Sequence, residues 1–190
     1  MMGLTACDSS PQLTPLSNNA VILAFGDSLT LGTGAERQQS YPARLQGMLS
    51  KTVINAGVPG EISKTGLIRL TSLLKRHRPE LLILCHGGND ILRNSNLKQK
   101  KDNLQQMIDL ARTNNTQVVL VSVPEFVIFL SPLPLYKELA VSNQIPLENT
   151  ALSDILADNR LKSDQIHPNS KGYKVFAERI HSLLQQTEAI

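Results

Sequence analysis

Four short apolar runs, spaced along the chain between stretches of helical periodicity, constrain the fold of this sequence most strongly. They cover residues 20–25, 52–55, 81–86 and 118–123, and the first run stops at Gly26. Runs of this length are typical of strands that are buried on both faces of a sheet. In the intervening stretches, apolar residues recur three or four positions apart, as on one face of a helix: Leu67, Leu70 and Leu74, then Leu104, Met107, Ile108 and Ala111.

This alternation predicts an α/β fold, namely a three-layer α/β/α sandwich around a mainly parallel sheet of about five strands. Parallel strands need crossover connections long enough for a helix, and those helices cover both faces of the sheet. Residues 145–147 are predicted as a short fifth strand. Pro168, which is followed by an apolar helical pattern, is predicted to mark the start of a final helix.

The composition suits one folded unit. The 190 residues are 41% hydrophobic, which is enough for one core in the usual size range of a single domain. Residues 1–19 lack sustained periodicity and are rich in Ser, Asn, Thr, Pro and Gln. We therefore predict a flexible N-terminal tail over residues 1–19 and one domain over residues 20–190.

Charge and residue spacing exclude several kinds of partner. The formal charge is +3, the aromatic content is 4%, and no basic block dominates, so we expect no nucleic-acid partner. The cysteines and histidines lack the spacing of metal ligands, so we expect no metal. We expect a monomer.

Polar residues gather where the predicted strands end. Residues 26–30, 57–61 and 87–90 follow the first three strands, and residues 164–168 lie on the loop that enters the last helix. Binding sites of open parallel sheets lie at the carboxyl edge of the strands. We therefore expect these segments to meet at one site.

A serine, a histidine and an aspartate in these segments predict nucleophilic catalysis. A serine hydroxyl needs a neighbouring base to take its proton, and histidine suits that task near neutral pH. Ser28 is the candidate nucleophile and His167 the candidate base, with Asp164 orienting the imidazole from three residues earlier on the same loop. Asp164 and His167 could instead cap the final helix.

Attack on a carbonyl creates an oxyanion, which requires hydrogen-bond donors already aimed at it. The candidates are the backbone N–H groups of Ser28 and Gly60 and the side-chain amide of Asn89. Asn89 could alternatively cap the helix after Gly88. Asp27 is expected to brace its loop rather than to react.

These segments, G-D-S-L-T, G-x-x-G, G-G-N-D and D-x-x-H-P, resemble in kind and order the four blocks of the SGNH (GDSL) hydrolase family. The resemblance covers residues 21 to about 184 and is closest to small bacterial arylesterases, acyl-CoA thioesterases and lysophospholipases. It implies a flavodoxin-like fold, no cofactor, and the residue roles given above. Two positions depart from the pattern: Pro59-Gly60-Glu61 stands where this branch often has Ser-Gly-Asp, and His86 precedes the glycine pair in place of an apolar residue.

The resemblance implies hydrolysis of carboxylic ester or thioester bonds of small to medium acyl groups through an acyl-Ser28 intermediate. The alternatives are a carbohydrate O-acetylesterase of the cell envelope, an acyltransferase, and a catalytically inactive binding module. Residues 125–135 are proline-broken and apolar. They form either a buried connection or a wall for an acyl chain, with Phe126, Ile128 and Phe129 as candidate substrate contacts.

Leu4-Thr5-Ala6-Cys7 resembles the lipobox of bacterial lipoproteins, and a Ser-, Pro- and Asn-rich stretch follows it. The positive and long apolar parts of a signal peptide do not precede it. The expectation is a bacterial cell envelope or periplasmic protein that is attached to the membrane through a lipid on Cys7. The alternative is a cytoplasmic protein in which the match arises by chance.

Overall fold

The computed structural model describes residues 11–125 and 130–190. Its centre is a five-stranded parallel sheet in the order β2-β1-β3-β4-β5. The predicted α/β fold with a parallel sheet of about five strands is confirmed. The strands are β1 (Val21–Gly26), β2 (Thr52–Gly57), β3 (Leu81–Cys85), β4 (Gln117–Val121) and β5 (Leu147–Glu148).

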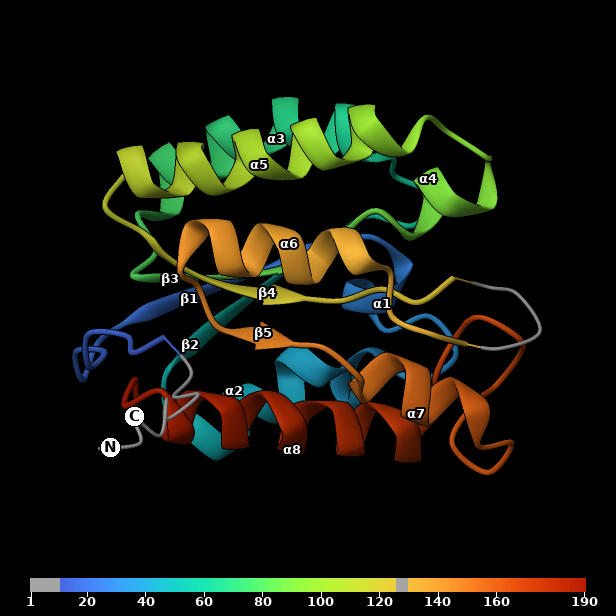
Figure 1. The fold of residues 1–190 in the computed structure, drawn as a ribbon. Helices are drawn as coiled ribbons and strands as arrows, with labels where there is room; N and C mark the ends of the chain where they lie inside the picture. Colours follow the sequence, from blue (N-terminus) through green and yellow to red (C-terminus); the bar gives the residue numbers. More distant parts are fainter. Residues whose placement is uncertain (1–10, 126–129) are drawn as a thin grey trace, which may run out of the picture.

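Helices cover both faces of the sheet (Figure 1). One layer contains α3 (Ser63–His77), α5 (Leu97–Thr113) and α6 (Pro134–Asn143), and the other contains α2 (Tyr41–Leu49), α7 (Ala151–Ala157) and α8 (Ser170–Gln186). Two short helices, α1 (Ser28–Leu31) and α4 (Gly88–Leu92), follow β1 and β3. They begin at the carboxyl edge of the sheet, where the candidate site residues were expected.

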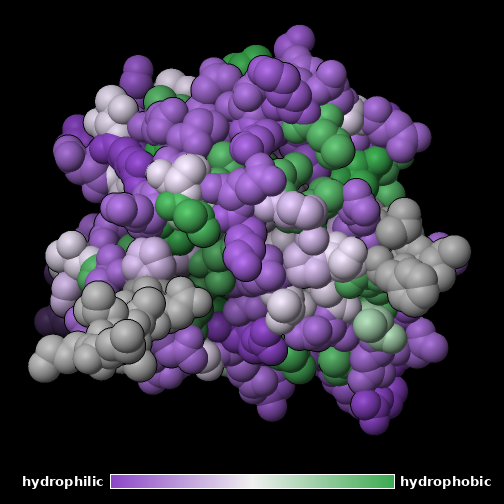
Figure 2. Space-filling model, in the orientation of Figure 1, coloured by the Kyte–Doolittle hydropathy of each residue, from purple (hydrophilic) through white to green (hydrophobic). Residues whose placement is uncertain are grey.

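The core lies on both faces of β1 and β3. Residues 22–25 and 81–85 are fully buried, because helices pack on each side of these strands. Burial of continuous apolar runs is the main favourable contribution to folding a sheet of this kind. Polar side chains cover most of the face seen in Figure 2, and apolar side chains appear there only in small groups.

The final helix begins later than Pro168 indicated. Helix α8 starts at Ser170, and Asn169 is its N-cap, because the Asn169 side chain accepts hydrogen bonds from the backbone N–H groups of Lys171 and Gly172. Pro168 therefore lies before the cap rather than in the first helical turn.

The second half of the predicted tail lies against the domain. The backbone N–H groups of Leu13 and Leu16 donate to the carbonyls of Thr187 and Ala189, and Leu16 is buried. The expected boundary at residue 20 thus differs from the structure, because apolar residues within the polar stretch pack beside the C-terminal residues. Cys7 lies outside the described residues. Within residues 11–125 and 130–190, no helix is both long and apolar enough to span a bilayer.

Candidate active site

Ser28 is the first residue of α1, directly after the turn that ends β1. Asp27 is the N-cap of this helix, and its carboxylate accepts the backbone N–H of Leu29 at 3.1 Å. Gly26 packs so closely on β3 that a Cβ atom there would lie 2.0 Å from the carbonyl oxygen of Cys85. The tight strand-to-helix turn thereby presents Ser28 at the edge of the sheet.

The loop before α8 brings His167 to Ser28. His167 Nε2 lies 3.0 Å from Ser28 Oγ, and His167 Nδ1 lies 2.8 Å from Asp164 Oδ2. The other carboxylate oxygen of Asp164 accepts the backbone N–H groups of Ile166 and His167, both at 2.8 Å. Asn169, and not Asp164 or His167, caps α8. The structure thus brings Ser28, His167 and Asp164 into one chain of hydrogen bonds.

The charge of Asp164 determines which atoms donate and which accept in this chain of hydrogen bonds. Partial burial would raise the pKa of Asp164, but hydrogen bonds from the Ile166 backbone and from His167 lower it below its usual value. An ionised carboxylate only accepts hydrogen bonds, so Nδ1 of His167 carries a hydrogen, and in the neutral imidazole Nε2 then has a free lone pair. In this tautomer His167 accepts the hydroxyl hydrogen of Ser28. Asp27, in contrast, is fully buried, and burial raises its pKa.

The three expected oxyanion donors lie on three neighbouring segments. Gly60 has a φ of 75°, a left-handed conformation that favours glycine. In the described part of the chain, the backbone N–H groups of Ser28 and Gly60 have no hydrogen-bond acceptor. The side-chain amide of Asn89 donates to the carbonyl of Glu61 at 3.1 Å and to Asp27 at 3.3 Å, so it points inward rather than capping α4.

A small, half-open pocket lies beside Ser28. Its wall is partly apolar and partly polar, and contains Asp27, Ser28, Leu29, Gly88, Asn89, Leu92, Ile166 and His167. The candidate acyl contacts Phe126, Ile128 and Phe129 lie outside the described residues. Among the residues that the structure describes, no three His, Cys, Asp or Glu side chains are grouped as metal ligands.

Comparison with known proteins identifies the family of this chain. A model of the GDSL-like lipase/acylhydrolase family matches residues 24–175, a range that includes all five candidate catalytic and oxyanion residues. The chain belongs to this family. The predicted resemblance to SGNH (GDSL) hydrolases is therefore confirmed.

Two curated relatives of this GDSL hydrolase are esterases or thioesterases. It is 29% identical over 180 residues to the thioesterase 1/protease 1/lysophospholipase L1 of Escherichia coli K12, with 86% of this chain and 83% of the relative covered. It is 30% identical over 168 residues to an arylesterase of Vibrio mimicus, with 83% and 84% covered. The GDSL hydrolase is accordingly a carboxylic ester hydrolase, as the sequence predicted.

Solved structures agree with the fold of the GDSL hydrolase. The crystal structure of TesA superposes with a TM-score of 0.80 at 27% identity and covers 88% of this chain and 99% of that chain. The structure of the esterase EstA from Pseudoalteromonas, inhibited by monoethylphosphonate, has a TM-score of 0.79 at 23% identity and covers 88% and 98%.

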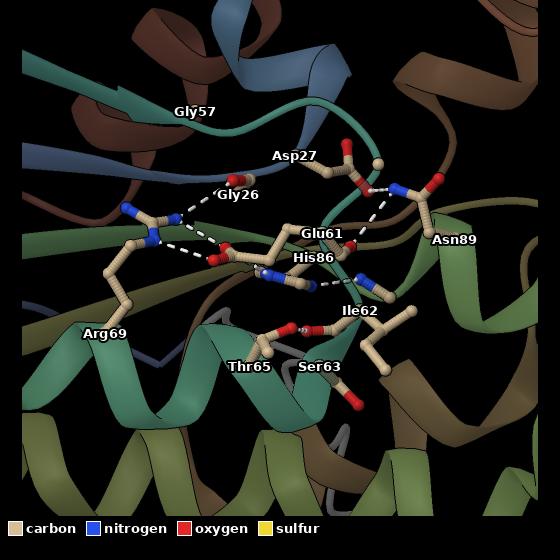
Figure 3. Close-up of polar contacts among 12 residues, drawn as sticks. Gly26, Asp27, Gly57, Glu61, Ile62, Ser63, Thr65, Arg69, His86 and Asn89 are labelled. Atoms are coloured by element: carbon tan, nitrogen blue, oxygen red, sulfur yellow. Dashed lines mark hydrogen bonds and ion pairs between the residues drawn. The ribbon is translucent and has the colours of Figure 1, made fainter.

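The sequence interpretation missed one polar cluster behind the site of the GDSL hydrolase. Glu61, Arg69 and His86 lie together on one side of the candidate oxyanion segments (Figure 3). His86 had been assigned no role, and Arg69 had not been considered. The signal available in the sequence was the pair of departures from the family pattern, since an acidic residue at 61 and a histidine at 86 can bind each other.

Proposed function

We propose that this protein hydrolyses carboxylic esters or thioesters of small to medium acyl groups through an acyl-Ser28 intermediate. The observation that carries the proposal is the chain of hydrogen bonds from Ser28 Oγ through His167 to Asp164. In this geometry, His167 Nε2 takes the Ser28 proton while the hydroxyl oxygen attacks the carbonyl carbon. The Asp164 carboxylate stabilises the imidazolium that forms.

Attack converts the carbonyl oxygen into an oxyanion, which the backbone N–H groups of Ser28 and Gly60 would stabilise. Asn89 would join them by turning to the oxyanion the amide hydrogen that it donates to Asp27 at 3.3 Å. The bond from the former carbonyl carbon to the alcohol or thiol then breaks, and the departing group takes the proton held by His167. A water molecule next attacks acyl-Ser28, with His167 again as the base, and releases the acid. No cofactor takes part in these steps.

The substrate class is supported by the relatives and by the pocket. The names of the relatives include both arylesterase and thioesterase, which is why the proposal includes oxygen and sulfur esters. Leu29, Leu92 and Ile166 in the pocket wall offer apolar contact to an acyl group.

The test is hydrolysis of p-nitrophenyl acetate, butyrate, octanoate and palmitate, with palmitoyl-CoA alongside, by the wild type and the Ser28→Ala variant. We expect turnover of the shorter esters and a loss of at least about 1000-fold in kcat in Ser28→Ala, because the nucleophile is gone. Ser142→Ala, which removes a hydroxyl on α6, is the matched control and should retain full activity.

Other outcomes would reject the proposal. Turnover of the acetyl ester alone would favour the carbohydrate O-acetylesterase, which acetylated sugars would then test directly. Absence of turnover on every ester by the folded wild type would favour the non-catalytic binding module.

We further propose that the protein belongs to the bacterial cell envelope and is attached there through a lipid on Cys7. The support is the sequence Leu4-Thr5-Ala6-Cys7 followed by a Ser-, Pro- and Asn-rich stretch. Mass spectrometry of the protein from native membranes should find a diacylglycerol adduct on Cys7. An unmodified Cys7, with the protein in the soluble fraction, would reject the proposal in favour of the cytoplasmic alternative.

A further inference from the structure

The three proposed oxyanion donors come from separate parts of the chain. Ser28 follows β1, Gly60 lies between β2 and α3, and Asn89 lies in α4 after β3. Parallel pairing brings the ends of these strands to the same edge of the sheet. Pairing alone does not direct three N–H groups at the position of one oxyanion. Contacts between the three segments must therefore set the distances among the donors.

One carboxylate makes such contacts. Glu61 Oε1 accepts Arg69 Nε at 2.8 Å, and Glu61 Oε2 accepts the terminal nitrogen of Arg69 at 2.6 Å and His86 Nε2 at 3.2 Å. The backbone N–H of Gly87 donates to His86 Nδ1 at 2.8 Å. Because a backbone N–H can only donate, Nδ1 has no hydrogen, and neutral His86 must carry its hydrogen on Nε2, where it faces Glu61.

The cluster is built into the interior. The Glu61 side chain is 7% exposed and the His86 side chain is fully buried. A carboxylate so placed requires donors, because an unpaired buried charge is strongly unfavourable. The Phe25 ring packs against both donors: its centroid lies 5.6 Å from that of the His86 ring, which is stacked on it, and 4.3 Å from the Arg69 guanidinium.

Gly66 on α3 makes room for the histidine. A Cβ atom at position 66 would lie 2.4 Å from His86 Nε2, the atom that faces Glu61. The helix can approach the imidazole only because this position has no side chain. Gly66 therefore provides a way to disturb the bond between His86 and Glu61 without removing a polar group.

Each member of the cluster lies close to one of the donors. Glu61 follows Gly60, and the Glu61 carbonyl accepts the Asn89 amide. His86 directly follows β3, on the segment that leads to Asn89. Arg69 donates to the carbonyl of Gly26, two residues before Ser28, at 3.4 Å. Figure 3 shows the cluster reaching all three segments.

We propose that the Glu61 carboxylate, held by Arg69 and His86, sets the relative positions of the three oxyanion donors, which makes Glu61 and His86 positioning residues for acyl transfer to Ser28. This inference rests on the proposed function. The oxyanion exists only after attack, so a displaced donor weakens binding of the transition state and not of the bound ester. The effect should appear in kcat with little change in KM.

The experiment measures kcat and KM on p-nitrophenyl butyrate, and the rate at which a p-nitrophenyl phosphonate labels Ser28. Glu61→Gln and His86→Leu should each lower kcat about 10- to 100-fold, with KM within about twofold, and should slow labelling in parallel. His86→Gln keeps a side-chain N–H that can donate to Glu61, so this variant should retain most of the kcat that His86→Leu loses. Gly66→Ala should lower kcat in the wild type but have little further effect in His86→Leu.

Glu148→Gln is the matched control, because Glu148 is a carboxylate of similar burial that binds Arg179 outside the site. It should lower thermal stability but leave kcat unchanged. The inference fails if the folded Glu61 and His86 variants keep kcat within twofold of the wild type, or if only KM rises. If His86→Leu does not fold, Gly66→Ala decides by the same criteria. Failure of the proposed function would appear separately, as activity that survives in Ser28→Ala.

Discussion

At the scale of single residues, Glu61 illustrates how a buried charge is stabilised. Burial would raise the pKa of its carboxyl group, but hydrogen bonds from His86 and Arg69 outweigh burial and lower the pKa from 4.5 to about 2. A carboxyl group whose pKa is lower in the folded state stabilises the fold above its unfolded pKa. That contribution is lost as the pH falls from about 4.5 through about 2.

We therefore predict that Glu61→Gln lowers the free energy of unfolding at pH 7 by about 1.5–3 kcal/mol, the range for hydrogen bonds to a charged group. The difference between wild type and variant should stay constant above about pH 5 and shrink toward pH 2, since the wild-type carboxylate then becomes protonated. Urea unfolding at pH 7, 5, 4 and 3 measures this difference.

Glu138→Gln serves as the control for this prediction. It removes an ion pair with Lys101 in which the glutamate side chain is 58% exposed. Exposed pairs contribute little, so this variant should unfold like the wild type at each pH. A difference between wild type and Glu61→Gln that did not change between pH 7 and pH 3 would contradict the role assigned to the Glu61 charge.

At the scale of elements, the strands and long helices could be predicted because each has a pattern of its own. Continuous apolar runs indicated β1, β3 and β4, and apolar spacing indicated α3 and α5. The short helices α1 and α4 could not be predicted in this way, since four or five residues make little more than one helical turn and show no periodicity. Their positions depend on the turns after β1 and β3.

Part of the candidate site could likewise be predicted from the sequence, and part could not. Ser28, Gly60, Asn89, Asp164 and His167 could be named because each stands in a short motif after an expected strand or before an expected helix. The role of His86 could not, because it depends on its bond to Glu61 and on the space left by Gly66, twenty positions earlier on a helix in another layer. Neither His86 nor Gly66 by itself indicates in the sequence that the imidazole packs against this helix. The start of α8 was missed because proline is also common just before an N-cap.

At the scale of the whole molecule, the N-terminal segment and the candidate site lie at opposite edges of the sheet. Ser17 binds Glu80 and Thr14 binds Gln117, and these two partners stand where β3 and β4 begin. In Figure 1 the C-terminus lies on the left, whereas α1 and α4 lie on the right. The path of residues 11–19 along the domain therefore does not obstruct the pocket beside Ser28.

This arrangement predicts that stability and activity separate when the N-terminal segment is removed. A chain that begins at residue 20 loses the buried Leu16 side chain and the hydrogen bonds to Thr187 and Ala189. Its free energy of unfolding should fall by about 2–4 kcal/mol, from one buried leucine and a few hydrogen bonds. A chain that begins at residue 11 keeps these contacts and is the reference for this comparison. Both should hydrolyse p-nitrophenyl butyrate with unchanged kcat, because the lost contacts lie at the far edge of the sheet. A lower kcat in the folded shorter chain would show that the two edges are coupled, since no residue of the site is altered.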